Sequence, residues 1–296
     1  MAEIRQTITL SEHLGASADK LEQIGVLNTN LGIDLKLFID PKLIKTSSVP
    51  ELADASLVIS SYFDRLLRIN AHAHLSPRLL HETLRMIAIK EPVGLSIGYG
   101  DSRDTGTSIP LSVAKDSLRS LNEMLSVGYR DITVMEMLGL FIRRFGADSI
   151  SDLISHIVYD HLCAFTARIC KENGFATSEF TVNGTKYYLP KHPFKGTQVI
   201  FVPLDVVSEL PIATSWDDIA AAAAANAKVR KDFNDIVKGN VKRYAKEIKK
   251  NPALLLQSTQ KMKTLVETYV QADVQPYDIS EDPLGYLRLN AYADEI

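Results

Sequence analysis

Cysteine is scarce in this chain of 296 residues, which contains only Cys163 and Cys170. The apolar periodicity around them predicts a single helix, in which positions seven apart lie about 10 Å from each other, too far for a disulfide. No histidine cue marks either thiol as a nucleophile. We therefore expect a reducing, cytoplasmic setting and no disulfide framework.

Long hydrophobic runs are also missing. No stretch approaches the roughly 18 consecutive apolar residues that suggest a membrane span. The first residues, Met1–Gln6, lack the apolar core of a signal peptide. Hydrophobic residues nevertheless make up 46% of the chain, enough to bury a substantial core. We expect a soluble globular protein that makes no membrane contact.

A strong net charge is absent, because the formal charge is −3 and the pI is near 6.2. This balance argues against a wholly basic protein that coats nucleic acid. A local excess of basic residues lies between positions 228 and 250, and it predicts either phosphate contacts or a solvated pair of helices. The candidate nucleic-acid-binding residues are Arg230, Lys231, Lys238, Lys242, Arg243 and Lys246.

The hydrophobic patterns predict a helix-rich α+β fold with a small sheet. A half-buried strand is expected over 33–40, a short one through Ile97 and an apolar one over 199–202. A β-hairpin is expected at 180–188, where Asn183-Gly184 suits a type I′ turn. The main helices are expected over 48–69, 76–90, 111–125 and 149–170, the first of them with a capping box of Ser48 and Glu51.

The chain changes character near residue 174, where helical patterns give way to the predicted hairpin. This change predicts an N-terminal helix-rich α/β domain over 1–174 and a C-terminal domain of β-hairpin and helices over 175–296. A single domain spanning both parts is the alternative. Within the first part, the glycine-bearing loop from Gly94 to Gly106 predicts either an anion cradle or an ordered surface loop. Its spacing matches neither the Walker A pattern nor the dinucleotide fingerprint.

Acidic residues cluster where the 149–170 helix begins. Asp148, Asp152 and His156 are the candidate catalytic residues, since side chains four apart on a helix can share a divalent metal. Asp160 continues this spacing, but a ligand from elsewhere would still be needed. The competing interpretation is structural: Asp152, His156 and Asp160 lie on a solvated face of the helix, or Ser149 caps the helix and Asp152 answers it. His161 falls among the apolar positions and is expected to be a hydrogen-bonded core histidine.

Several short segments, in order, resemble an uncharacterised bacterial family associated with restriction and phage-defence gene neighbourhoods. They are Leu37–Pro41, Ile97–Tyr99 with the loop that follows, Gly146–Asp152, Val202-Pro203, Asn226 with Arg230 and Asn234, Pro276–Asp278 and Asp282-Pro283. Longer members of that family continue into a C-terminal domain that looks like a PD-(D/E)XK nuclease. Asp205 and Glu179, the nearest substitutes for its carboxylates beside a predicted strand, lack the expected lysine partner in sequence.

Two functions of different classes follow. The resemblance implies a non-catalytic recognition or scaffold subunit of a prokaryotic antiphage-defence system, which contacts nucleic acid, a separate effector protein such as a nuclease or ATPase, or both. The alternative is a metal-dependent nuclease or hydrolase that uses Asp148 and Asp152. A divalent metal is expected as cofactor only under this alternative.

Overall fold

The computed structural model describes residues 8–35, 37–90, 92–98, 109, 111–115, 117–118 and 147–208. Two short helices open the described chain, α1 (Leu10–Leu14) and α2 (Ala18–Gln23). Thr9 and Glu12 form a capping box at the start of α1, and Ser17 caps α2. These caps satisfy backbone N–H groups that a helix terminus leaves without partners.

Strand β1 covers only Phe38–Ile39 and pairs antiparallel with β4 (Val207–Ser208). The expectation of a half-buried strand over 33–40 is wrong. The strand is shorter than expected, and residues 37–40 are all buried. The short strand expected through Ile97 is an isolated parallel bridge to Leu35. Helix α3 (Pro41–Ile44) follows β1, with Asp40 as its N-cap.

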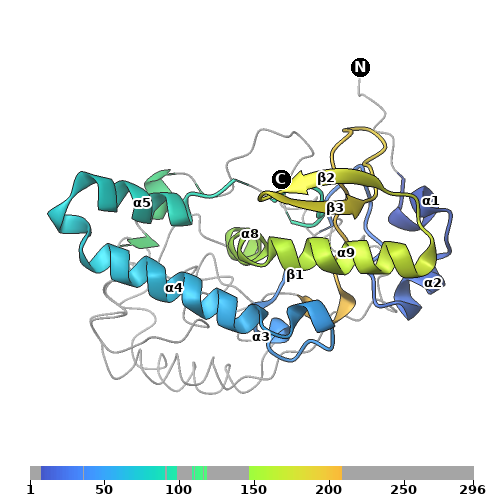
Figure 1. Ribbon diagram of the computed structural model, residues 1–296, viewed down its shortest axis with the longest axis horizontal. Helices are drawn as coiled ribbons and strands as arrows, with labels where there is room; N and C mark the ends of the chain where they lie inside the picture. The colour runs from blue at the N-terminus through green and yellow to red at the C-terminus, as the bar shows by residue number, and fades with distance from the viewer. Residues whose placement is uncertain are drawn as a thin grey trace, which may run out of the picture.

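A long antiparallel helix pair projects to one side of the molecule (Figure 1). It consists of α4 (Ala55–Ala71) and α5 (Pro77–Ile87), joined by the 3₁₀ turn η2 (Ala73–Leu75). Ser76 caps α5 as the Ser-Pro sequence predicts. The capping box expected from Ser48 is not formed: the 3₁₀ turn η1 (Pro50–Leu52) intervenes, and the Ser48 backbone N–H donates to Asp205 instead.

The centre of the molecule is helix α8 (Ala147–Ile157), followed by α9 (Tyr159–Asn173). A single helix was expected here, but the chain turns at Val158, so that α8 is seen end-on in Figure 1 while α9 runs across the view. The hairpin of β2 (Ser178–Val182) and β3 (Thr185–Leu189) packs on α9. Asn183 and Gly184 both have positive φ angles, which confirms the predicted turn.

Residues Val199–Val202 are completely buried, yet they do not belong to a sheet. Their backbone groups instead bond to four different parts of the chain: Val199 N–H donates to Pro190, Ile200 N–H to Gly94 and Phe201 N–H to the Thr166 hydroxyl, while the Val202 carbonyl accepts from Leu27 N–H. Such buried peptide groups must find partners. The 3₁₀ turn η4 (Leu204–Val206) then leads into β4.

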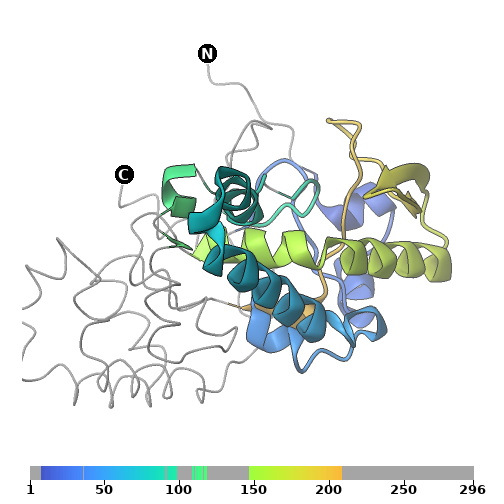
Figure 2. The ribbon, with the colours of Figure 1, turned by 60° about the vertical axis from the view of Figure 1, so that its left-hand side comes forward.

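The fold is therefore helix-rich α+β with small antiparallel pairings, as expected. Its larger core cluster contains side chains from α4, α8 and β1 together with Val182, Leu189 and Ile200. Described residues on both sides of position 174 thus share one core, and Figure 2 shows the hairpin lying along α9. Within the part of the chain that is described, no helix has the length and apolar character needed to cross a bilayer.

Candidate functional site

Helix α8 carries all three residues that the sequence offers as catalytic, and it is buried over most of its length. Asp152 has only 8% of its surface exposed, whereas His156 near the end of the helix is exposed. Desolvation still lowers the pKa of His156 below its usual range. Asp148 lies in the first turn of α8, and its side chain is outside the described part.

The expectation that Asp152 belongs to a solvated face is wrong. Helix α8 packs against β1 on one side and α4 on another, and the neighbouring Ser151 hydroxyl accepts a hydrogen bond from Ile39 N–H at 3.1 Å. A helical wheel assumes that one face meets water, but this helix is enclosed. Helix α8 is therefore a central helix in which polar residues, among them Ser151 and Asp152, are buried.

The predicted column of Asp152, His156 and Asp160 is not continuous, because the chain turns at Val158. Asp160 belongs to α9 and faces the hairpin. Its carboxylate accepts from Asn183 Nδ2 at 3.2 Å and from the Tyr187 hydroxyl at 3.4 Å. Among the described residues no group of three His, Cys, Asp or Glu side chains could hold a metal ion.

His161 lies at the junction of α9 and α4. Its Nε2 is 3.1 Å from the Asp54 carboxylate, while its Nδ1 is buried and has no hydrogen-bond partner among the described residues. The side chain is 18% exposed, whereas that of Asp54 is 69% exposed. The expected hydrogen-bonded histidine is therefore present, at the edge of the core rather than inside it.

Both cysteines are free and buried on α9. Burial raises the pKa of each thiol to about 12. A thiol with such a pKa is almost entirely protonated near neutral pH, and the thiolate is the reactive form. The two residues therefore pack as small hydrophobic side chains.

The described start of the glycine-bearing loop is part of the core. Gly94 has φ +88°, and a Cβ atom there would lie 2.3 Å from the Gln198 carbonyl oxygen. Its own carbonyl accepts from Ile200 N–H, and Gly98 N–H donates to Leu35. Packing therefore explains the glycine at position 94. The rest of this loop, from Tyr99 to Gly106, lies outside the described residues.

Asp205 and Glu179, the two carboxylates considered as substitutes for a nuclease motif, make different kinds of interaction. Asp205 accepts hydrogen bonds from the hydroxyls of Ser47 and Ser48 at 3.0 to 3.1 Å. Glu179 has a lysine partner that sequence spacing did not reveal, because Lys186 Nζ lies 2.7 Å away across the hairpin. Both side chains of that pair are exposed on the surface of the hairpin.

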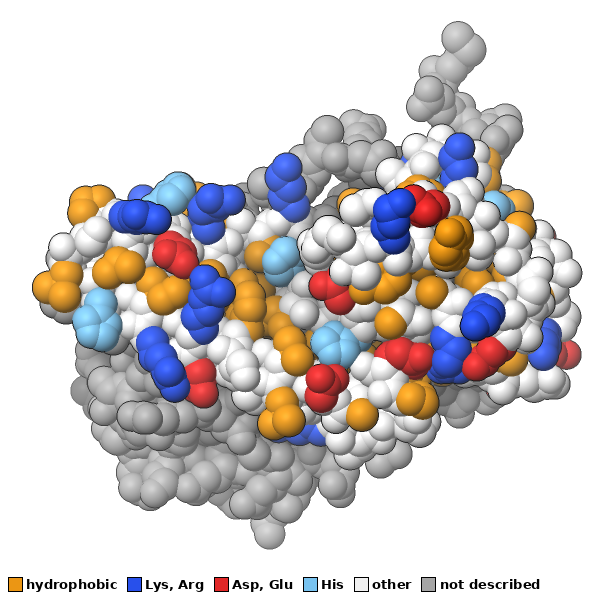
Figure 3. Space-filling model, viewed as in Figure 1, with side chains coloured by type: hydrophobic (Ala, Val, Ile, Leu, Met, Phe, Trp, Pro, Cys, Tyr) orange, Lys and Arg blue, Asp and Glu red, His pale blue; other side chains and the backbone are white. Residues whose placement is uncertain are grey.

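Sequence reasoning missed a basic surface on the α4 and α5 pair. Residues 55–90 contain five Arg or Lys residues and two Asp or Glu residues, a formal charge of +3 in a chain whose total is −3. The five are Arg65, Arg68, Arg78, Arg85 and Lys90. Figure 3 shows several blue side chains over these helices. Counting charge for each predicted helix would have found this surface.

The basic residues predicted from sequence, Arg230, Lys231, Lys238, Lys242, Arg243 and Lys246, all lie outside the described residues. The same holds for the helices expected after position 208.

The comparisons with known proteins assign a family. Residues 16–215 match the model described as "Domain of unknown function (DUF8370)". The chain belongs to this family. No curated protein and no solved structure matches it. The DUF8370 match extends from just before α2 to beyond β4, so it includes the α4 and α5 pair and the central helix, whereas the basic segment at 228–250 lies after it.

Proposed function

We propose that this DUF8370 protein is a non-catalytic recognition or scaffold subunit of a prokaryotic antiphage-defence system, which contacts nucleic acid, a separate effector protein such as a nuclease or ATPase, or both. This proposal depends on the hydrogen bonds that the carboxylates of the protein form. Carboxylates that could have served catalysis instead connect distant segments of the fold.

Two such connections and one buried carboxylate support the proposal. Asp160 holds the hairpin through Asn183 and Tyr187. Asp205 binds the loop at Ser47 and Ser48. Asp152 is enclosed within α8, where a solvent-borne substrate would not reach it. A catalytic carboxylate needs access to the proton or metal that it serves, and these carboxylates are instead committed to the fold.

A metal-dependent nuclease or hydrolase built on Asp148 and Asp152 is the competing function, and Asp152 separates the two. We expect Asp152→Ala to lower the melting temperature by several degrees, because it removes a buried polar group together with its partner interaction. Differential scanning fluorimetry measures this shift. A metal-dependent cleavage of DNA or RNA that Asp152→Ala abolishes, with the melting temperature unchanged, would contradict the proposal.

The subunit role has its own measurement. Affinity purification from cells of the native host, followed by native mass spectrometry, is expected to recover the chain with a second protein, with nucleic acid, or with both. Lys242→Glu together with Arg243→Glu then tests the predicted basic segment. If the chain is purified as a monomer without any partner and binds no nucleic acid at low salt, the recognition role is wrong.

A further inference from the structure

We infer that the exposed face of α5, continued by Lys90, is a binding site for the phosphate backbone of nucleic acid. This inference rests on the proposed function, since it names a surface through which a recognition subunit would contact nucleic acid. It concerns described residues within the DUF8370 match, and it is separate from the basic segment at 228–250.

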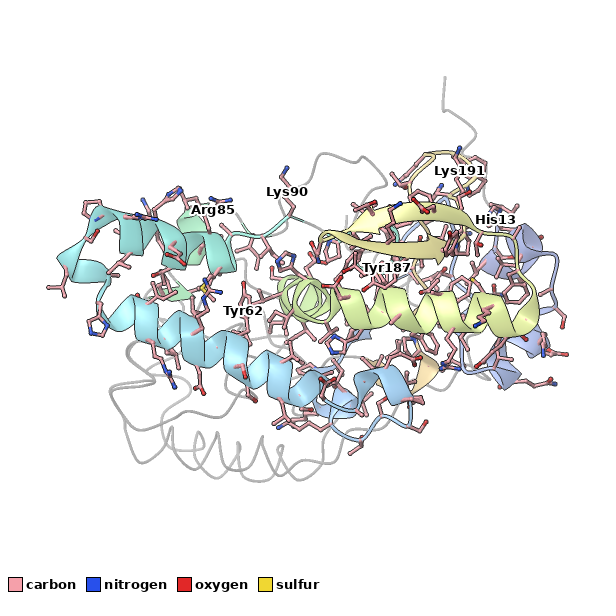
Figure 4. The ribbon with its side chains drawn as sticks, in the orientation of Figure 1. His13, Tyr62, Arg85, Lys90, Tyr187 and Lys191 are labelled. Carbon is pink, nitrogen blue, oxygen red and sulfur yellow. The ribbon has the colours of Figure 1, made fainter. Side chains whose placement is uncertain are left out.

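Arg78, His81 and Arg85 are all exposed and lie three and seven positions apart on α5. At 100° for each residue these positions fall within about 60° of one another, so they form one row along the helix. Lys90 follows three residues after the helix ends and is also exposed. We call these four residues the α5 stripe. In Figure 4 Arg85 and Lys90 lie on the same outer edge of the molecule.

The positive charges of the α5 stripe are not neutralised by described carboxylates. The acidic residue of α5 is Glu82, which pairs with Arg65 of α4 at 3.1 Å. No ion pair within 4 Å joins Arg78, Arg85 or Lys90 to any carboxylate in the part of the chain that the structure describes. Unpaired surface cations of one sign in a row produce a local positive potential, even though the whole chain is slightly acidic.

The opposite face of α5 holds the stripe in place. Thr83, Leu84 and Ile87 are buried against the core, and the Tyr62 hydroxyl of α4 donates to the Met86 carbonyl. Ser76 caps the first turn. Packing fixes the backbone of α5, so the positions from which the basic side chains extend stay constant, and only the side chains themselves lose conformational freedom on binding.

The spacing suits a phosphate backbone. Arg78 and Arg85 are separated by about 10 Å along the helix axis, which corresponds to about three nucleotides at 3.4 Å for each strand. Arginine forms bidentate hydrogen bonds with phosphate oxygens. Contacts of this kind neutralise charge without reading base sequence. The stripe should therefore bind nucleic acid in a salt-dependent, sequence-independent manner.

An anionic membrane surface is the other polyanion to consider. Leu80 is 44% exposed, as a membrane-binding helix would require beside its cations. However, Leu80 lies two positions from Arg78, about 200° around the helix. Apolar groups that insert into a bilayer should flank the basic row on the same side. The arrangement therefore favours nucleic acid.

Charge reversal of the full-length chain tests the stripe. The variant is Arg78→Glu with Arg85→Glu, and the matched control is Lys20→Glu with Lys191→Glu, which changes the formal charge equally at exposed positions. In Figure 4 Lys191 lies at the end of the molecule away from α5. Fluorescence anisotropy with labelled duplex DNA and single-stranded RNA of mixed sequence measures the dissociation constant between about 50 and 200 mM salt.

We expect the stripe variant to raise the dissociation constant at least about tenfold and to lower the slope of log K against log salt by about 2. The control should bind nearly as the wild type does.

If the stripe and control variants weaken binding equally, the inference is wrong but the proposed function stands. If the wild-type protein binds neither nucleic acid, both the inference and the nucleic-acid part of the proposed function are wrong. Binding of the wild type to phosphatidylserine vesicles but not to nucleic acid, lost in the stripe variant, would also overturn the inference. Circular dichroism checks that both variants are folded.

Discussion

At the scale of single residues, polar side chains of this protein connect segments that are distant in sequence. The Arg168 guanidinium binds both carboxylate oxygens of Glu51, at 2.6 and 3.1 Å. It also donates to Glu172 one turn along α9. A guanidinium matched to a carboxylate in this way is the strongest form of such a pair. Glu51 and Arg168 therefore fasten α9 to the turn η1.

The Glu51 and Arg168 pair gives a prediction about pH. The hydrogen bonds from Arg168 hold the pKa of the Glu51 carboxyl below its usual 4.5. Stabilisation by this group is therefore fully present above pH 4.5 and is lost as the pH falls through the lower, folded-state pKa. We expect Glu51→Gln to reduce the free energy of unfolding by about 1 kcal/mol at pH 7, since the pair is partly exposed.

Urea denaturation at pH 7 and pH 3 measures this difference. The gap between wild type and Glu51→Gln should narrow as the pH falls toward 3. Glu179→Gln is the control, because it removes a charge from the more exposed pair with Lys186 and should have a smaller effect at pH 7. A gap that is unchanged at pH 3 would show that Glu51 acts through packing and not through its charge.

Glycine at position 94 gives a second prediction at this scale. Gly94→Ala should destabilise the protein by about 2 kcal/mol or more, because the added Cβ would collide with the Gln198 backbone and the φ angle of +88° is unfavourable for alanine. Gly15→Ala is the matched control: its φ is +65°, but nothing lies within 4 Å of the added atom. Thermal unfolding of both variants separates collision from backbone strain, and equal losses would contradict the packing argument.

At the scale of elements, helix α9 packs against two different parts of the chain. It carries the hairpin on one side and η1 on another. Tyr159, at its first position, donates to the Val93 carbonyl and accepts from Gln198 Nε2 at 3.0 Å. Burial raises the pKa of this hydroxyl well above its ordinary value. The hydroxyl therefore stays protonated at neutral pH and remains able to donate.

The attachment of the hairpin to α9 can be tested at Asp160. Asp160→Ala removes the acceptor of both Asn183 and Tyr187, and each such bond contributes about 1 kcal/mol. We expect faster hydrogen exchange of the backbone amides in 178–189 with a small change in overall melting temperature. Tyr188→Phe is the control, because the Tyr188 hydroxyl donates to the exposed Glu179. Unchanged exchange in Asp160→Ala would show that apolar packing alone holds the hairpin.

At the scale of the whole molecule, the buried segment Val199–Val202 unites the described chain. Ile200 and Val202 belong to the larger core cluster, while Val199 and Phe201 belong to the smaller one with α1 and α2. Alternate residues of an extended segment point in opposite directions. One segment therefore contributes to both clusters, and the residues after the predicted boundary at 174 complete the core of those before it.

Phe201 tests this role. Its side chain is fully buried, so Phe201→Ala should lower the free energy of unfolding by about 3 to 5 kcal/mol. Phe194→Ala is the matched control, since that ring is 46% exposed. Urea denaturation followed by far-ultraviolet circular dichroism and by tyrosine fluorescence should give coincident transitions in the wild type. Separate transitions would show that the two clusters unfold independently.

Local chemistry was readable from the sequence alone. Asn183-Gly184 specifies its hairpin turn because both residues tolerate positive φ, and Ser76-Pro77 specifies the start of α5 because the cap and the proline act within one turn. The helix-rich α+β class follows from apolar spacing.

Tertiary structure decided the features that depend on what surrounds an element. The pattern of α8 is compatible with a solvated face, but packing on β1 and α4 buries Asp152 and removes it from that face. Ser48 could have capped a helix, and Asp205 binds it instead. Asp160 faces the hairpin because the chain turns at Val158. Periodicity reports which residues share a face, whereas burial and partner choice depend on contacts between segments far apart in the chain.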